Sequence, residues 1–403
     1  MFRLAMRNVF RQKTRSLMTL AAIVFGVIGL LLSGGFVHDM FGKLAEAIIH
    51  SQTGHLQLAE AGFFMQGSRA PEKYLIANPK ALAGQIERLP QVADVAARIQ
   101  FSGLLNNGRS DLSIIGEGIE AEKEARLGTY LVVKAGRRLT DSDTFGALIG
   151  EGVARALKLA PGDRIALLVS SAEGAMNTLD FEIVGVFQSF SKEYDARAVK
   201  ISLVAAQELL NTPGANVLVV SLKRTSDTAA SAEALDRLAA GTGLEIRTWS
   251  QLNDFYPKTV KLYDRQFGVL RLIILVMVLL SVVNSVNMSV FERVGEFGTM
   301  RALGDRSRTV FATVVAEGVV LGLFGSALGV VLGAALALAV SAIGIPMPPP
   351  PNSNLGYVAE IRIVPSVVVA AFATGFLATV LASIVPAIRV TRIAIVDALR
   401  QNI

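Results

Sequence analysis

Cysteine is absent from the 403-residue chain, and histidine occurs only at positions 38, 50 and 55. The lack of cysteine excludes a disulfide framework and a thiolate metal site. The histidine spacings of 12 and 5 do not suit a metal centre, so we predict none. We expect His38 at a membrane exit, and His50 and His55 on a connecting helix or at a strand start. The sequence has no GxSxG motif and no conspicuous pair of carboxylates, so we predict that the chain is not an enzyme.

The chain also lacks the loop with which many ATP-driven proteins bind phosphate, GxxxxGK followed by Ser or Thr. Its one Gly-Lys pair, Gly42-Lys43, is followed by Leu44 and does not fit that loop. If the chain takes part in ATP-driven work, a partner must therefore hydrolyse the ATP. We predict no cofactor within this chain.

The net charge of +6 lies outside the longest stretch of mixed composition. Residues 1–16 carry five basic and no acidic side chains, residues 292–308 carry four against three, and residues 389–403 carry three against one. Residues 38–267, in contrast, carry 25 basic and 27 acidic side chains. We predict no nucleic-acid partner, because the basic excess lies at the edges of apolar runs.

Four runs are apolar and long enough to cross a bilayer as helices, since about 20 residues span its hydrocarbon core. They lie within residues 17–37, 268–291, 309–343 and 363–388. A secretory signal peptide is the competing interpretation of the first run, but that run is long and lacks a clear small-x-small cleavage site. We therefore predict four transmembrane α-helices in a 1+3 arrangement around one large domain.

The basic segments set the predicted orientation, because the cytoplasmic flanks of membrane helices are rich in Lys and Arg. This rule places the amphipathic segment 1–16, the loop 292–308 and the tail 389–403 in the cytoplasm. The domain 38–267 and the proline-rich loop 344–362 then lie outside. We predict a multi-pass protein of the bacterial inner membrane with both termini in the cytoplasm.

Residues 38–267 are predicted to form a large α+β extracytoplasmic domain. Short runs rich in Val, Ile, Leu and Phe indicate strands, and turn signals such as Asn107-Gly108 and Pro161-Gly162 separate them. Two stretches, GEGVARALKL and SDTAASAEALDRLAAG, have helical spacing. A composition shift near residues 111–134 suggests two subdomains, and the charged run EAEKEAR at 120–126 is interpreted as a solvated face.

The loop after the second run, FERVGEFGTMRALGDRSRT, combines four Arg with three acidic residues. It spaces Phe297, Met300 and Leu303 about a helical turn apart, which predicts an amphipathic helix ending at Gly304. Such a helix suits either a protein partner or the lipid headgroups.

Small and polar residues within the apolar runs predict close helix packing. Glycines recur on one face of the third run, and we leave open whether the neighbour they admit belongs to the same chain: Gly318, Gly322, Gly325, Gly329 and Gly333. In the second run Ser281, Asn284 and Ser285 share a face, which suits a dimer interface or a substrate cavity. Glu317 is expected to snorkel or to pair with a nearby Arg.

Four stretches of the sequence resemble the FtsX-like permeases, the family that contains the macrolide exporter MacB and the lipoprotein-release permeases LolC and LolE. ERVGEFGTMRALGDRSRTV is similar to the family's coupling segment, and LAMRNVFRQKTRSLMTLAAIVFGV resembles its N-terminal entry. GRRLTDSDTFGALIGEGVARALKLAPGDRI looks like its periplasmic core domain, and PAIRVTRIAIVDALR resembles its C-terminal close. The resemblance spans most of the chain.

This resemblance implies an ABC transporter permease whose coupling segment docks on a separate cytoplasmic ATPase dimer. That partner binds the ATP and Mg, and a second permease copy or a paralogue faces the first. The residues that the resemblance assigns to contact with the ATPase are Glu292, Arg293, Glu296, Phe297, Arg301, Ala302 and Gly304.

Mechanotransmission is the expected mechanism: the ATPase moves the coupling segment, and the helices relay this movement to the external domain. The resemblance implies a lipoprotein, lipid or amphiphile as the substrate. Because the helices carry few polar residues for a wide channel, we expect it to be taken from the periplasm or the outer leaflet. A periplasmic or outer-membrane component is a further possible partner. The alternative is an FtsX-like signalling protein that activates periplasmic cell-wall hydrolases. A secondary transporter is disfavoured by the lack of acidic residues at mid-membrane and of an inverted repeat.

Overall fold

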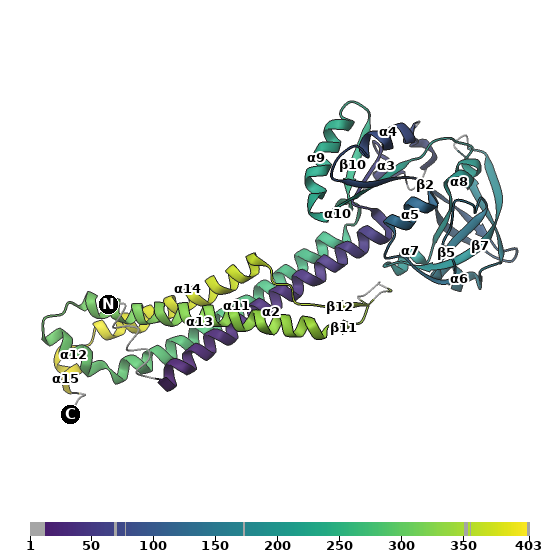
Figure 1. The fold of residues 1–403 in the computed structure, drawn as a ribbon. Coiled ribbons are helices and arrows are strands. Elements are labelled where there is room, and N and C mark those ends of the chain that lie inside the picture. Colours follow the sequence, from purple (N-terminus) through teal and green to yellow (C-terminus); the bar gives the residue numbers. More distant parts are fainter. Residues whose placement is uncertain are drawn as a thin grey trace. The chain divides into compact units, whose positions relative to one another are not determined.

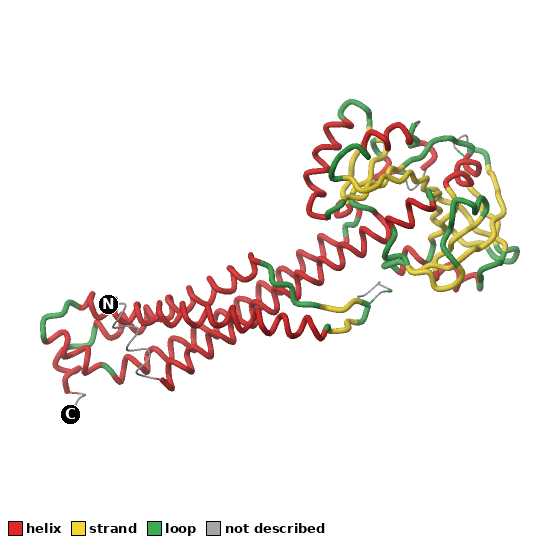
Figure 2. The backbone as a smooth tube through the Cα atoms, viewed as in Figure 1, coloured by secondary structure: helices red, strands yellow, loops and turns green. Residues whose placement is uncertain are grey.

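The computed structural model describes residues 13–67, 71–76, 78–171, 174–349, 354 and 356–400. The chain divides into two compact units. The helical unit comprises residues 1–42, 259–346 and 358–403, and the core unit comprises residues 43–258 with 347–357. Figures 1 and 2 show the helices of the first unit and the strand-rich second unit.

The helical unit contains four helices that are long and apolar enough to cross a membrane. They are α2 (Lys13–Ile48), α11 (Phe255–Glu292), α13 (Ser307–Ile343) and α14 (Pro365–Thr391). Two short helices, α12 (Val294–Ala302) and α15 (Ile395–Arg400), pack against each other. The helices α2 and α11 continue past the apolar runs into polar sequence, so the membrane boundaries along them stay predictions.

Apolar side chains from α2, α11, α13 and α14 form the core of the helical unit, with Ile23, Val282, Val314 and Ala378 among the buried members. Figure 1 shows α13 and α14 side by side. Most of segment 1–16 lies outside the described residues, as do residues 350–353 of the proline-rich loop. Strands β11 (Ile345–Met347) and β12 (Tyr357–Ala359) flank that loop and form a two-stranded sheet.

The core unit is built on one ten-stranded mixed sheet in the order β10-β1-β9-β2-β3-β8-β5-β7-β4, with β6 pairing β2 and β7. The pairs β3·β8 and β5·β7 are parallel, and the other pairs are antiparallel. The strands are β1 (Leu56–Glu60), β2 (Val92–Asn106), β3 (Asp111–Ile119), β4 (Val132–Gly136), β5 (Gly146–Gly150), β6 (Arg164–Ser170), β7 (Met176–Gln188), β8 (Ala198–Ser202), β9 (Val217–Leu222) and β10 (Leu244–Thr248).

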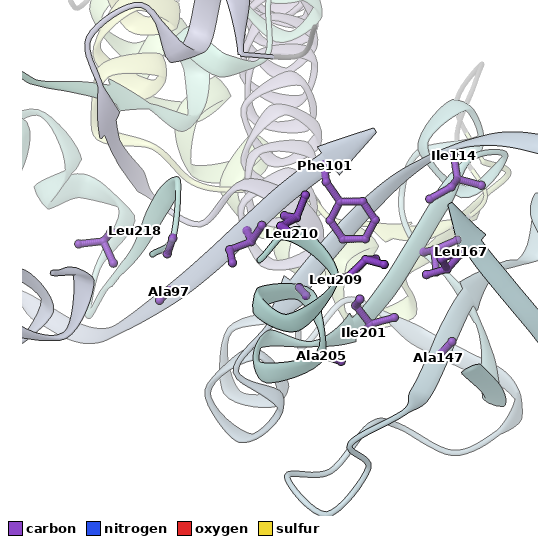
Figure 3. Close-up of a cluster of buried hydrophobic side chains, with 14 of the residues drawn as sticks. Ala97, Phe101, Ile114, Ala147, Leu167, Ile201, Ala205, Leu209, Leu210 and Leu218 are labelled. Atoms are coloured by element: carbon purple, nitrogen blue, oxygen red, sulfur yellow. The ribbon is translucent and has the colours of Figure 1, made fainter. Parts of the chain in front are cut away.

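Short helices join and cover these strands. They are α3 (Phe63–Gln66), α4 (Pro79–Ile86), α5 (Ala121–Leu127), α6 (Glu151–Leu157), α7 (Lys192–Asp195), α8 (Leu203–Leu210), α9 (Thr228–Ala239) and α10 (Trp249–Leu252), with a π-helical turn η1 (Ile49–Thr53) and 3-10 turns η2 (Pro71–Lys73) and η3 (Thr225–Asp227). Helix α8 packs its buried face onto the sheet, where Leu209 and Leu210 join Phe101 and Ile201 (Figure 3). This is the largest apolar cluster of the core unit.

The α+β prediction is confirmed, and each sequence run interpreted as a strand or a helix coincides with one. The two predicted helices correspond to α6 and α9. The composition shift at 111–134 does not divide the sheet, because β2 and β3 pair across it from Arg98↔Ile119 to Asn106↔Asp111. His50 lies in η1 and His55 directly precedes β1, as expected.

Candidate functional site

The segment after α11 turns sharply at Arg293, which separates α11 from α12. Helix α12 buries Val294, Gly295, Phe297 and Gly298. The helix ends at Ala302, and Gly304 has φ +105°, a left-handed conformation that glycine adopts without a Cβ penalty. Gly304 therefore follows the helix in a conformation that stops it, but the helix itself ends two residues earlier than predicted.

Arg293 fixes this corner through three contacts. Its Nη1 donates to Glu317 Oε1 at 2.8 Å and to Oε2 at 2.9 Å, and its Nε donates to Glu296 Oε2 at 3.0 Å. The guanidinium also lies over the Phe297 ring, 5.0 Å from its centroid. Because Arg293 and Glu317 are only 12% and 13% exposed, their ion pair is screened little by solvent. The expected pairing of Glu317 with an Arg is confirmed.

The structure separates the seven residues predicted to contact an ATPase into two groups. Glu292, Glu296, Ala302 and Gly304 are exposed. Arg293, Phe297 and Arg301 are engaged within the chain: Phe297 is 2% exposed, and Arg301 Nη1 donates to Ile393 O at 2.6 Å. The contact roles of all seven stay predictions.

Leu303 is not among the seven residues assigned to ATPase contact, yet it is 84% exposed. Helical spacing had grouped it with Phe297 and Met300. Because α12 ends at Ala302, Leu303 does not lie on the helix face that carries Phe297 and Met300. Those two side chains pack against the apolar core of the helical unit.

The glycine face of α13 packs against helices of the same chain, which answers the question that the sequence left open. A Cβ at position 318 would lie 2.6 Å from Ser383 Cβ, and one at 322 would lie 3.2 Å from Thr379 Cβ, both on α14. A Cβ at 325 or 329 would meet Ile23 or Val27 of α2 at 2.9 or 2.8 Å. The glycines thus allow α13 to approach two neighbours closely.

The polar residues of α11 do not share one environment. Ser285 is half-buried and hydrogen-bonds to Thr19 of α2. Ser281 and Asn284 are exposed on the outer surface of α11. The three residues that the sequence grouped therefore divide between packing within the chain and a free helix face.

A buried cluster of four charges lies in the core unit and was missed in the sequence. Glu117 of β3 and Lys200 of β8 are register partners, and Lys200 Nζ lies 2.7 Å from Glu117 Oε2 and 2.9 Å from Glu124 Oε1. Arg98 of β2 donates to both Glu124 oxygens, through Nε at 3.1 Å to Oε2 and Nη2 at 2.8 Å to Oε1. The interpretation of run 120–126 as a solvated face is wrong for Glu124, because its carboxylate compensates two buried cations.

The cluster pairs two cations, Arg98 and Lys200, with two anions, Glu117 and Glu124, and these opposite charges shift the pKa values of its members. Burial by itself would raise the pKa of Glu124, but Arg98 and Lys200 outweigh burial and lower it to about 2. Burial opposes the positive form of Lys200, yet Glu117 and Glu124 raise its pKa above its ordinary value. All four groups therefore stay ionised at neutral pH, and the cluster is structural. Among the described residues no group of three or more His, Cys, Asp or Glu is placed to hold a metal ion.

The fold and this site define a class: a helical membrane protein with an α+β periplasmic core domain, of the ABC transporter permease type. The family model for the MacB-like periplasmic core domain matches residues 16–238, and the model for the FtsX-like permease C-terminal region matches residues 268–395. The first match covers more than half of the chain, so the chain belongs to the FtsX-like permeases with a MacB-like periplasmic core domain.

Curated relatives agree with this assignment. The chain is 23% identical over 360 residues to an uncharacterised ABC transporter permease of Methanocaldococcus jannaschii, a match that covers 84% of each chain. It is 22% identical over 321 residues to the lipoprotein-releasing system transmembrane protein LolE of Haemophilus influenzae, covering 77% of this chain and 74% of LolE. It is 21% identical over 334 residues to LolC of Neisseria meningitidis serogroup B, covering 80% and 76%.

Two solved structures are similar to part of this chain. The periplasmic region of MacB from Actinobacillus actinomycetemcomitans matches with 17% identity and a TM-score of 0.38, covering 54% of this chain and 98% of that structure. The extracellular domain of the transporter YknZ from Gram-positive bacteria matches with 15% identity and a TM-score of 0.35, covering 48% of this chain and all of that domain. ABC permeases work with a partner ATPase, so this chain is a membrane subunit of such a system.

Proposed function

We propose that this permease couples ATP hydrolysis by a cytoplasmic partner to the extraction of a lipoprotein, lipid or amphiphile from the periplasm or outer leaflet. The ATPase dimer binds the ATP and Mg, and this chain contributes no catalytic residue. Segment 292–308 and both termini face the cytoplasm of a bacterial inner membrane.

The exposure of Leu303 carries this proposal. It is an apolar side chain at the end of α12, between exposed Glu296 and exposed Asp305. Phe297 of the same segment is buried and Met300 is partly buried. A leucine that is 84% exposed at this point suits apolar contact with a partner protein. The ATPase is the partner that the family provides.

The corner at Arg293 gives the docked segment a rigid connection. Arg293 links α12 through Glu296 and Phe297 to α13 through Glu317. A displacement of α12 is therefore passed to α13 and, through the chain itself, to α11. This is the first step of mechanotransmission, and it needs no water-filled channel through the helices.

A lipoprotein is the substrate that we place first. The names of LolE and LolC describe lipoprotein-releasing proteins, and the matches to them cover most of this chain. This ranks release above the alternative of FtsX-like signalling to cell-wall hydrolases. A periplasmic or outer-membrane component would then receive the substrate.

A second permease copy or a paralogue is proposed to cover the outer face of α11. Ser281 and Asn284 are exposed there beside Met277, Leu280 and Met288. Polar side chains on a membrane helix need hydrogen-bond partners that lipid tails do not offer. The chain has no cysteine, so an Asn284→Cys variant provides a clean test: disulfide cross-linking between copies is expected in the membrane.

Co-purification with the candidate ATPase tests the docking proposal. We expect intact chain to retain the ATPase, and a Glu296→Lys, Leu303→Asp double variant to lose it. Met65→Asp makes the same kind of apolar-to-acidic change as Leu303→Asp at an exposed position of the core unit. It serves as the control for that substitution and should retain the ATPase. Equal retention by the intact chain and the double variant would overturn the assignment of this segment.

A further inference from the structure

The junction between α2 and the sheet is a π-helical turn, Ile49–Thr53, which continues α2 directly. Gly54 ends the turn with φ +65° and donates its N–H to Ile49 O at 2.9 Å. A Cβ at this position would lie 2.4 Å from Val219 Cγ1, so the exit requires glycine. Single π-turns of this kind are frequent at functional positions.

Two contacts from the core hold the outer side of this turn. Arg98 of the buried charge cluster donates through Nη1 to Gln52 O at 2.6 Å. Tyr130, which follows α5, donates its backbone N–H to His50 O at 3.2 Å. The turn is thus attached both to the sheet and to the segment after α5.

His50 makes the contacts that set its protonation state. Its Nε2 lies 3.2 Å from Glu46 Oε2, and its Nδ1 lies 3.2 Å from the carbonyl oxygen of Leu127. Carboxylate and carbonyl oxygens only accept hydrogen bonds, so both nitrogens of His50 must carry a proton. The complete set of contacts exists only for the imidazolium form, and His50 is 25% exposed, so solvent protons reach it.

His55, the neighbouring histidine, has the opposite character. Leu222 donates its N–H to His55 Nδ1 at 3.2 Å, so His55 is neutral and its Nε2–H donates to Thr225 Oγ1 at 3.1 Å. Thr225 Oγ1 in turn donates to Glu46 Oε1 at 2.7 Å. Burial, followed by the nearby His50, lowers the pKa of His55 to about 4, although Glu46 raises it.

The side chains that face His50 come from α2, from the residue before β1 and from the segment after α5. They are Glu46 of α2, His55 before β1, and Tyr130. The Tyr130 ring is stacked with the His50 ring, and the two ring centroids are 6.2 Å apart. Histidine is the side chain type whose charge changes between about pH 5 and 8.

We propose that His50 is a protonation-dependent positioning residue, which locks the π-turn between α2 and the core domain when it is positively charged. When His50 loses a proton, one ring nitrogen has no hydrogen to donate and faces an oxygen that can only accept. The hydrogen bond of that nitrogen, to Glu46 or to Leu127, then breaks. The turn then loosens. The effect on transport rests on the proposed function, but the lock itself does not, and it can be measured without an ATPase.

The sole tryptophan of the chain provides a reporter at the turn. Trp249 packs with Ala45, Ile48 and Ile49, and its backbone N–H donates to His55 O at 3.0 Å. We would record the emission of Trp249 from pH 5 to 9 with the full chain in lipid nanodiscs. A sigmoidal change in the histidine range is expected. His50→Gln should abolish this change, and His38→Gln, the matched control, should keep it.

Backbone hydrogen exchange adds a second measurement. After correction for the intrinsic effect of pH, protection of the amides of Gly54 and Tyr130 should fall about tenfold between pH 5.5 and 8.5 in the wild type. Glu46→Gln removes the charge but keeps the shape of the side chain, and its transition should move to lower pH. The proposal would be overturned if the Trp249 emission and the amide protection of the wild type did not depend on pH. It would also be overturned if His50→Gln kept the transition, or if Glu46→Gln left its midpoint where it is in the wild type.

Discussion

Asn354 Nδ2 donates a 2.5 Å hydrogen bond to Asp195 Oδ2 in the core unit. Its backbone N–H also donates to Phe190 O at 3.1 Å, and Asp195 accepts from Ser189 N with both carboxylate oxygens at 3.0 Å. Burial raises the pKa of Asp195, while the hydrogen bonds from Ser189 and Asn354 lower it. The loop between α13 and α14 is therefore attached to the core unit at this carboxylate.

Removal of the Asn354 side chain should release this attachment. We expect Asn354→Ala to lose about 1.5–3 kcal/mol of local stability, the range for a hydrogen bond to a charged group. Hydrogen exchange of residues 189–195 should accelerate, while that of β9 should not. Unchanged exchange of residues 189–195 would show that Asp195 is held by Ser189 alone.

Lys200→Met should destabilise the core unit strongly, because it removes one of two cations from a buried, balanced cluster. The expected loss is about 3–5 kcal/mol, the range for one partner deleted from a buried ion pair. Thermal unfolding of the purified protein measures it. Arg155→Met, at an ion pair that is largely exposed, should change stability by less than about 1 kcal/mol and serves as the control. Similar losses in both variants would contradict the structural role of the cluster.

The same cluster predicts a defined dependence on acid. The pKa of Glu124 is about 2 in the folded chain against an ordinary value of 4.5, so the folded state binds this proton less readily than the unfolded state. Its contribution to stability is complete above pH 4.5 and is lost as the pH falls toward 2. In Lys200→Met the pKa of Glu124 in the folded chain should rise toward its ordinary value, so the acid-dependent loss should become smaller and should end at higher pH. Thermal midpoints between pH 7 and 2.5 test this shift, and an identical pH profile for both proteins would count against it.

The α13 glycine face predicts a strong dependence on side-chain size. At position 318 a Cβ would lie 2.6 Å from Ser383 Cβ, an atom that rotation of the serine cannot move away. We expect Gly318→Leu to destabilise the helical unit by about 1–3 kcal/mol through overpacking. Gly268→Leu is the matched control, since nothing lies within 4 Å of a Cβ there. Thermal aggregation of the two variants in detergent should therefore differ clearly.

The sequence predicted elements well where a signal is local. NVLVVSL is one of the short Val- and Leu-rich runs that indicate strands, and it corresponds to β9. The helical spacing of SDTAASAEALDRLAAG corresponds to α9. Length and apolarity were likewise sufficient to predict the four long helices. In each case the pattern lies within one element, so no knowledge of its neighbours was needed.

The parts that the sequence did not predict depend on distant partners. Glu124 lies in a strongly charged run, and its buried cations are 26 and 76 residues away, so its burial has no local signal. The spacing of Leu303 placed it on the same helical face as Phe297 and Met300, but helix α12 ends one residue before it, at Ala302. The neighbours of the α13 glycines lie on α2 and α14, and spacing alone does not identify them.

A charge exchange at Arg293 and Glu317 tests whether their ion pair transmits movement from α12. Arg293→Glu places two carboxylates together, and Glu317→Arg places two guanidiniums together, so each single variant should open the corner. We expect both to retain the bound ATPase, because Leu303 is untouched, but to lose about tenfold or more of substrate release per ATP hydrolysed. The double variant restores opposite charges and should recover most of that ratio. Glu296 remains near position 293 and would repel a glutamate there, so recovery should be incomplete and should improve further with Glu296→Gln. If the double variant is no better than either single variant, Arg293 acts through Phe297 and Glu296 rather than through Glu317.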